Sequence, residues 1–214
     1  MFRNFNIQEM LLRIPILLIS FTVHEFFHGW TAYRLGDNTA KYDGRLSLNP
    51  LKHIDPVGAL LLIVVGFGWA KPVMVDYRNL RNPKQDMAVI AFAGPLSNFL
   101  LAFVFTLLII PCVFIPVGPL SDIPYNFALQ GIFTNVGLGI FNLLPLPPLD
   151  GSKVLGSLLP INMYYKYMSI ERYGFIILIL LSFTGVLGMI LSPMINAATS
   201  GYIFVANWIL QLFV

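Results

Sequence analysis

The stretch "SFTVHEFFHGW", Ser20–Trp30, places two histidines and a glutamate inside an apolar run. His24 and His28 lie four residues apart, so in a helix both side chains project from the same face. Glu25 follows His24 directly and can reach a water molecule beside that face without being a metal ligand. Burying ionisable groups in a membrane segment is costly, and such groups are commonly functional and paired.

The spacing H-E-x-x-H is typical of metalloproteases. Zinc in a catalytic site takes three protein ligands and leaves one position for water, so a third ligand must come from elsewhere in the chain. Zinc lowers the pKa of the water toward neutrality, and the glutamate takes the proton as general base. The alternative is a structural hydrogen-bonding role for His24, Glu25 and His28.

The composition predicts an α-helical polytopic membrane protein. Of 214 residues, 57% are hydrophobic and only 11% are charged, whereas a soluble domain has about 25% charged residues. The net charge of +3 is small and the basic residues cluster in loops. We therefore expect contact with a lipid bilayer and no nucleic-acid partner. We expect one domain, residues 1–214, with a core at about 8–160 and C-terminal helices at about 171–213.

Uncharged segments predict about five transmembrane helices, with a range of four to six. A spanning helix needs about 20 apolar residues. The two C-terminal helices are expected to be separated at "SPMIN", residues 192–196, because proline disrupts a helix interior. The predicted spans lie at 8–35, within the 35 uncharged residues 87–121, within the 27 uncharged residues 123–149, and twice within the 42 uncharged residues 173–214.

The segment Val57–Ala70 is uncharged but has only 14 residues and is interrupted by glycines. It is too short to span a bilayer, so we expect a re-entrant or membrane-associated β-hairpin after the first helix. The part from Gly66 to Asp76 could present a strand edge that receives an unwound substrate by strand addition. Pro72 is compatible with an edge strand. The alternative is a purely structural hairpin.

The distribution of Lys and Arg predicts the orientation. Residues 34–84 hold eight basic residues and residues 153–172 hold three, while the loop near Ser121 holds none. Both basic loops are therefore expected in the cytoplasm. His24 lies ten residues before Arg34, roughly 15 Å along a helix. Asp150 directly precedes the second basic loop, so the active site is expected toward the cytoplasmic side.

The stretch "FNLLPLPPLDG", residues 141–151, suggests the third ligand. Asp150 is the only acidic residue between Asp122 and Glu171. The three prolines break or kink the helix, and the exposed backbone is tolerated at membrane depth only inside the protein or beside a cavity. The alternative is an interfacial aspartate that caps a helix end.

Together these motifs resemble the site-2 protease family, peptidase family M50, in its compact single-domain branch. "HEFFH" (24–28), "AGPLSN" (93–98) and "NLLPLPPLDG" (142–151) match the family's motifs in the right order. "RLGDNTAKYDGRLSLNPLKHIDPVG" (34–58) and "GFGWAKPV" (66–73) are similar to the compact branch. One departure is Leu143, where many members have proline.

The resemblance implies a role for each matching residue. His24, His28 and Asp150 would bind one Zn²⁺ per chain, and Glu25 would activate water. Asn98 and Asn142 would bind substrate or stabilise the oxyanion. The alternative for Asn98 is an interhelical hydrogen bond among small residues. His53 is left out of the metal set as a loop histidine at the membrane interface.

The function implied by the resemblance is a zinc-dependent intramembrane endopeptidase. It would hydrolyse peptide bonds in or near the transmembrane segment of a membrane-protein substrate. The compactness of the chain leads us to expect a prokaryotic cell membrane, and the lack of room for a further regulatory domain leads us to expect a regulatory membrane partner. One alternative is a metal-ion transporter. A transporter is expected to have several weak metal sites and often inverted repeats, and the sequence shows neither. Another alternative is a non-catalytic membrane scaffold, against which the intact H-E-x-x-H and Asp-Gly motifs argue.

Overall fold

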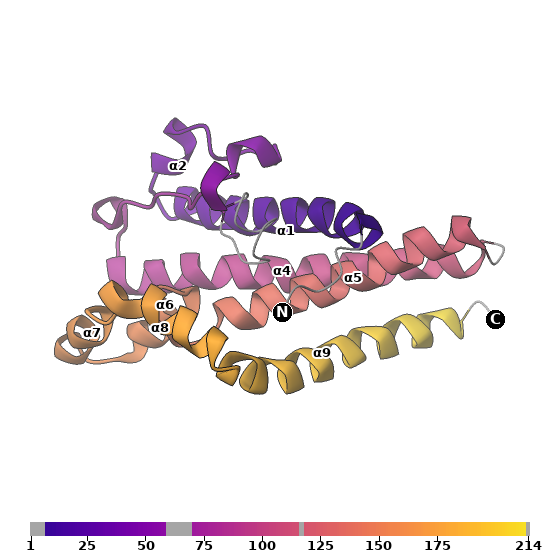
Figure 1. The fold of residues 1–214 in the computed structure, drawn as a ribbon. Helices are drawn as coiled ribbons and strands as arrows, with labels where there is room; N and C mark the ends of the chain where they lie inside the picture. Colours follow the sequence, from indigo (N-terminus) through magenta and orange to yellow (C-terminus); the bar gives the residue numbers. More distant parts are fainter. Residues whose placement is uncertain (1–6, 59–69, 116–117, 213–214) are drawn as a thin grey trace.

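The computed structural model describes residues 7–58, 70–115 and 118–212 (Figure 1). In these ranges the chain is helical and contains no named strand. The long helices are α1 (Ile7–Arg34), α4 (Pro83–Val113), α5 (Pro119–Asn142) and α9 (Val186–Leu210). The short elements are α2 (Thr39–Tyr42), η1 (Pro50–Lys52), η2 (Tyr77–Asn79), α6 (Asp150–Leu158), α7 (Ile161–Met168) and α8 (Glu171–Phe183).

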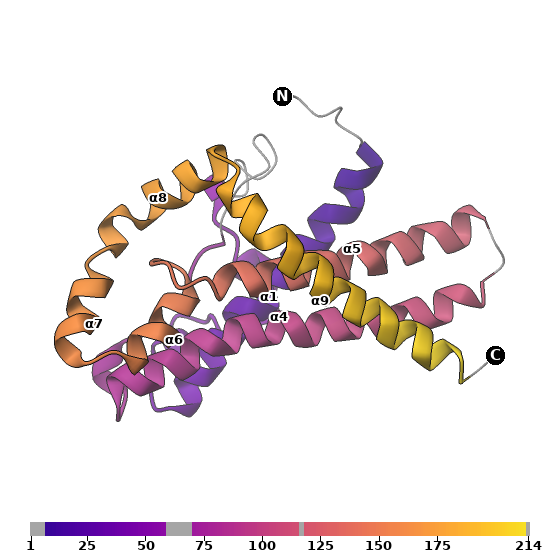
Figure 2. The ribbon, with the colours of Figure 1, turned by 90° about the horizontal axis from the view of Figure 1, so that it is seen from below.

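Helix α4 is the centre of the fold. It packs against α1, α5, α6 and α9, and Figure 2 shows α9 crossing α4 and α5 diagonally. Apolar side chains from α1, α4, α5 and α9 form the main core, among them Ile16, Phe105, Ile132 and Ala206. Helix α4 lies between the two predicted metal-binding segments in the sequence. It also packs against both of them, against α1 with the histidines and against α6 with Asp150.

The outer face of α4 is apolar and exposed. Its exposed side chains recur at helical spacing and include Leu96, Leu100, Phe103 and Leu107. In water such a stripe would be a large apolar patch, whereas in a bilayer it is the surface that faces lipid. Among the described residues, α4 and α9 combine the length and composition needed to cross a membrane. The helical membrane class is supported, and the number of five spans stays a prediction.

The C-terminal helices divide at a different place from the one predicted at 192–196. Pro193 lies inside α9, and the break falls between α8 and α9 at Gly185, whose φ is +76°. Glycine adopts this left-handed conformation without a steric penalty, while a proline inside a membrane helix is tolerated when neighbouring groups satisfy the freed backbone. The prediction of the break was therefore wrong. Helix α8 has 13 residues, about 20 Å, and is shorter than the hydrocarbon core.

The hairpin predicted at 57–70 lies mostly outside the described residues. At its margins Ile54 and Ala70 form an isolated antiparallel bridge. The backbone N–H of Lys71 donates to the carbonyl oxygen of His53 at 2.9 Å. The chain then runs without regular structure through residues 71–76 toward η2, and this segment passes beside the site described next.

Candidate metal centre

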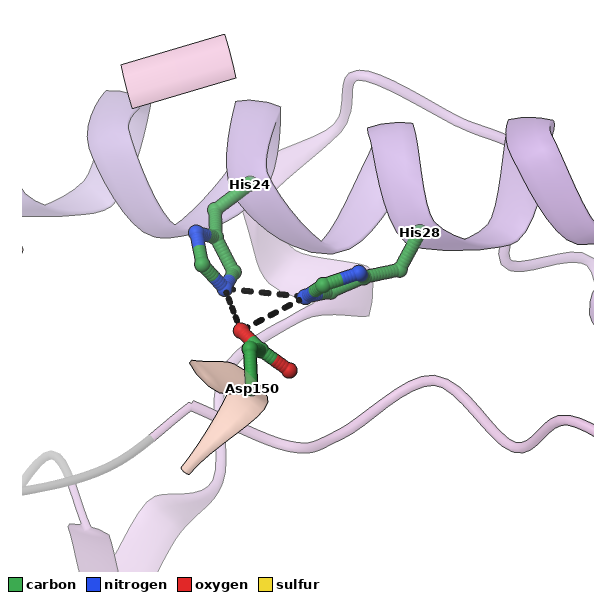
Figure 3. Close-up of side chains that lie close together, drawn as sticks. All are labelled: His24, His28 and Asp150. Atoms are coloured by element: carbon green, nitrogen blue, oxygen red, sulfur yellow. Dashed lines mark hydrogen bonds and ion pairs between the residues drawn. The ribbon is translucent and has the colours of Figure 1, made fainter. Parts of the chain in front are cut away.

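His24, His28 and Asp150 converge, although Asp150 lies more than 120 residues after the histidines (Figure 3). The two histidine Nε2 atoms are 3.0 Å apart. Each of them lies 3.2 Å from Oδ2 of Asp150. The histidines project from one face of α1, and Asp150 is the first residue of α6. The structure thus brings together the three side chains singled out in the sequence.

The other nitrogen of each imidazole contacts helix α4. Nδ1 of His28 lies 2.7 Å from the carbonyl oxygen of Ile90, and Nδ1 of His24 lies 2.6 Å from Oδ1 of Asn98. A carbonyl only accepts, so His28 donates from Nδ1 and its Nε2 carries a lone pair when the ring is neutral. Histidines that bind metals have this arrangement, with the second nitrogen donating to a fixed acceptor.

The donor set fits a zinc ion. Two imidazole nitrogens and a carboxylate oxygen meet at 3.0–3.2 Å, and acceptors so close repel each other unless a proton or a cation lies among them. A tetrahedral ion with bonds of about 2.0–2.1 Å holds its ligands about 3.3 Å apart. One cation satisfies all three acceptors at once. Two histidines, one carboxylate and an open position form a catalytic zinc pattern.

One face of α4 accommodates the two imidazoles. Ile90, Gly94 and Asn98 follow one another at intervals of four residues and therefore lie on one face. A Cβ atom on Gly94 would overlap Nε2 and Cε1 of His28 and would lie 2.7 Å from Cε1 of His24. Only glycine allows α4 to approach this closely, which gives a physical reason for the "AGP" motif.

Asp150 reaches the histidines because α5 ends early. Helix α5 stops at Asn142, and the prolines that follow cannot continue it. The chain turns through residues 143–149, and α6 begins at Asp150. Leu149 is the N-cap of α6, and the Asp150 carboxylate is directed to the imidazoles rather than to its own helix end.

Glu25 is held beside the site by the extended segment after residue 70. Its Oε2 accepts a hydrogen bond of 2.9 Å from the backbone N–H of Val73. The same segment is fixed by Arg45, whose guanidinium donates to the carbonyl oxygens of Lys71 and Pro72. These contacts fix the Glu25 carboxylate, which lines the same cavity as His24, His28 and Asp150.

A buried carboxylate, Asp37, anchors the far end of this segment. It accepts hydrogen bonds from the Thr39 backbone and hydroxyl, from the Asn79 amide and from the Asp76 backbone N–H. Burial raises the pKa of Asp37, but the hydrogen bonds outweigh burial and hold that pKa below its ordinary value. Asp37 therefore joins the loop after α1 to the segment that contacts Glu25.

A cavity of about 1070 Å³ opens onto the site. His24, Glu25, His28 and Asp150 line it together with Asn142 and with apolar side chains from α1, α4, α5 and α8. Its volume is slightly above the range of ordinary ligand pockets, about 300–1,000 Å³, so it has room for an extended stretch of polypeptide.

The remaining predicted residues lie in three different settings. Asn142 lines the cavity, and its amide donates to the carbonyl oxygen of Leu138 at 3.0 Å. Asn98 is fully buried and is not among the lining residues; its contacts favour the interhelical hydrogen bond over direct contact with substrate. Nε2 of His53 lies 2.7 Å from the carbonyl oxygen of Ser47, and His53 is not part of the cluster found among the described residues.

Sequence reasoning missed Asn135, Arg45 and the backbone groups of Ile90 and Val73. Asn135 on α5 is fully buried, and its Oδ1 accepts a hydrogen bond of 3.0 Å from the Asn98 amide. An amide in the middle of an uncharged span needs a polar partner, and this signal could have identified Asn135. The backbone contacts carry no signal in the side-chain sequence.

The family model and the known proteins to which this chain is similar are described as peptidases or zinc metalloproteases. The model of the family described as "Peptidase family M50" matches residues 13–127. The "Putative zinc metalloprotease YwhC" of Bacillus subtilis is 40% identical over 201 residues, covering 91% of this chain and 90% of the relative. A "Putative zinc metalloprotease" of Methanocaldococcus jannaschii is 32% identical over 156 residues, covering 71% of this chain and 73% of the relative. No solved structure matches the chain.

Proposed function

The chain belongs to peptidase family M50, the site-2 protease family of membrane-embedded zinc metalloproteases, and we propose that it is an intramembrane endopeptidase that binds one zinc ion per chain. The observation that carries the proposal is the meeting of His24, His28 and Asp150 beside Glu25, on one cavity between packed apolar helices. Membership in this family favours the protease over the metal-ion transporter.

The proposed ligands are His24, His28 and Asp150. A zinc ion held by them would supply Lewis-acid chemistry, lowering the pKa of a water molecule and polarising the scissile carbonyl. Glu25 accepts the proton of the attacking water and passes it to the departing amine, so that the water adds across the broken peptide bond. The N–H of Val73 keeps the Glu25 carboxylate oriented between these two transfers.

Asn142 is the proposed donor to the oxyanion. It lines the cavity with the ligands and with Glu25, and an amide N–H₂ group donates to developing negative charge. Asn98 acts instead through His24, because its side chain is directed to that imidazole.

The proposed substrate is the transmembrane segment of another membrane protein. The apolar lining of the cavity suits a hydrophobic chain, and the volume of about 1070 Å³ suits an unwound stretch of it. The Lys and Arg distribution supports a site that faces the cytoplasm, the side from which water would enter. The similar proteins of Bacillus subtilis and Methanocaldococcus jannaschii support a prokaryotic cell membrane. A membrane partner would regulate access.

The test compares Glu25→Gln with wild type in detergent-purified protein. Bound zinc is measured by elemental analysis, and cleavage is measured on a model single-pass substrate. We expect the variant to keep one zinc per chain and to lose cleavage, because the ligands are intact and the base is absent. Asp43→Asn is the matched control, since this carboxylate is exposed in the loop after α1 and is not among the residues that line the cavity, and it should keep both properties.

Three results would contradict the proposal in whole or in part. Wild-type protein that holds no zinc would exclude the metal centre. A Glu25→Gln variant that cuts as fast as wild type would exclude the general base and would favour a different mechanism at the same site. Zinc binding without cleavage by wild type would favour the scaffold.

A further inference from the structure

Three helices are linked by a buried row of hydrogen bonds that ends at a proposed ligand. Nδ2 of Asn135 on α5 donates to the backbone carbonyl oxygen of Gly131 at 2.9 Å. Nδ2 of Asn98 on α4 donates to Oδ1 of Asn135 at 3.0 Å. Oδ1 of Asn98 in turn lies 2.6 Å from Nδ1 of His24 on α1. Both asparagines are completely buried.

The direction of each hydrogen bond in this row is determined by the first acceptor. The Gly131 carbonyl can only accept, so Asn135 must turn its N–H₂ group toward it and its oxygen toward Asn98. Asn98 must then donate to Asn135 and present its own oxygen to His24. An oxygen at this position accepts, so the His24 proton is fixed on Nδ1 and the Nε2 lone pair faces Asp150 and His28.

From this geometry we propose that Asn135 is a positioning residue that selects the metal-binding tautomer of His24 through Asn98. The inference rests on the proposed metal centre, and it assigns a role to a residue that touches neither the ligands nor the cavity. His28 needs no such relay, because the Ile90 carbonyl fixes its tautomer directly.

Removing Asn135 should free the Asn98 amide to rotate. With Asn135→Leu, which roughly keeps the side-chain volume, Asn98 no longer has an acceptor on α5. Its N–H₂ group can then turn toward His24 and donate to Nδ1, which moves the ring proton to Nε2. A proton on Nε2 competes with the metal, so zinc affinity should fall by about tenfold, the lower end of the range for partners behind a ligand.

The tautomer can be measured directly because the chain has three histidines. The experiment uses imidazole ¹⁵N NMR on full-length, zinc-free protein in detergent, at a pH where the rings are neutral. Spectra of single His→Gln variants assign the signals. We expect wild-type His24 to be protonated on Nδ1, and Asn135→Leu to show a population protonated on Nε2. Zinc affinity is measured in parallel by competition with a chelating dye.

A rescue variant separates positioning from packing. Asn98→Asp places an acceptor at His24 whichever way the side chain turns, so Asn98→Asp combined with Asn135→Leu should restore the Nδ1 proton. Thr106→Val is the control, because Thr106 is an equally buried polar residue of α4 that donates only to its own helix at Ala102. It should leave the tautomer and the zinc affinity unchanged.

The tautomer and the zinc affinity are measured without any cleavage assay, so this test can fail or succeed independently of the test of the proposed function. Asn135→Leu with the wild-type tautomer and the wild-type zinc affinity would overturn the inference, as would an equal change in Thr106→Val. Asn135→Ala serves if the leucine variant does not fold. The NMR result does not depend on cleavage, so a shifted tautomer supports the inference even if no substrate is cut.

Discussion

Gly94→Ala should disable the metal centre without removing a ligand. The added Cβ would lie 2.7 Å from Cε1 of His24, and ordinary contacts of this kind begin at 3.4 Å. The ring must therefore move by about 0.7 Å, and His28, whose ring atoms are closer still, must move further. A site requires its groups within about 0.5 Å of their working positions, and a displacement of about 1 Å can reduce activity about 100-fold. We expect losses of about this size in zinc affinity and in kcat/KM.

The assay titrates zinc into detergent-purified protein and follows thermal unfolding and cleavage of a single-pass substrate. Gly137→Ala is the matched control, since Gly137 is also a helical glycine but its Cβ would meet Ile195 at an ordinary 3.7 Å. The control should keep wild-type zinc affinity and gain up to about 1 kcal/mol from helix propensity. Wild-type zinc affinity and cleavage in Gly94→Ala would refute the argument that close approach of α4 fixes the ligands.

Four further outcomes are expected. Asp150→Ala should weaken zinc binding by more than about 100-fold, because it removes a ligand rather than a group behind one; elemental analysis checks this. Asn142→Ala should lower kcat by about 10²–10³ and keep the zinc, as loss of an oxyanion donor does. Removing zinc with a chelator should lower the thermal midpoint, and re-adding zinc should restore it. Asp37→Asn should be less stable than wild type at neutral pH. The gap should close on acidification, because a depressed carboxyl pKa stabilises the fold above the unfolded value of about 3.9 and loses this effect as pH falls through the folded value; thermal unfolding against pH measures it.

The long helices could be predicted from the sequence because a long segment without charged residues indicates a helix that can span a membrane. The range 8–35 anticipated α1 within a residue or two at each end, and Asn142 at the end of α5 precedes the expected proline break. The C-terminal break was placed at Pro193 rather than at Gly185 because sequence reasoning weighs the lost hydrogen bond of proline, not the left-handed turn that glycine permits.

The sequence was enough to predict which three side chains come together in the site. It was not enough to predict how the neighbouring side chains are arranged around them. The spacing of His24 and His28 implies a shared face, and the isolated carboxylate at residue 150 implies a partner. Nothing in the spacing reveals that Asn98 contacts His24 rather than the cavity, because that choice depends on how α4 is rotated against α1. Rotation is set by the packing of many apolar side chains, and apolar composition alone fits several rotations.

We therefore infer that metal binding requires the packing of α1 against α4 and not only the H-E-x-x-H motif. A helix with histidines at i and i+4 offers four ring nitrogens on one face. Helix α4 occupies the two Nδ1 atoms, through the Ile90 carbonyl and the Asn98 amide, and leaves the two Nε2 atoms directed at Asp150. Because the same contacts lie in a buried helix interface, any change that separates the two helices weakens the metal site, even when every ligand is retained.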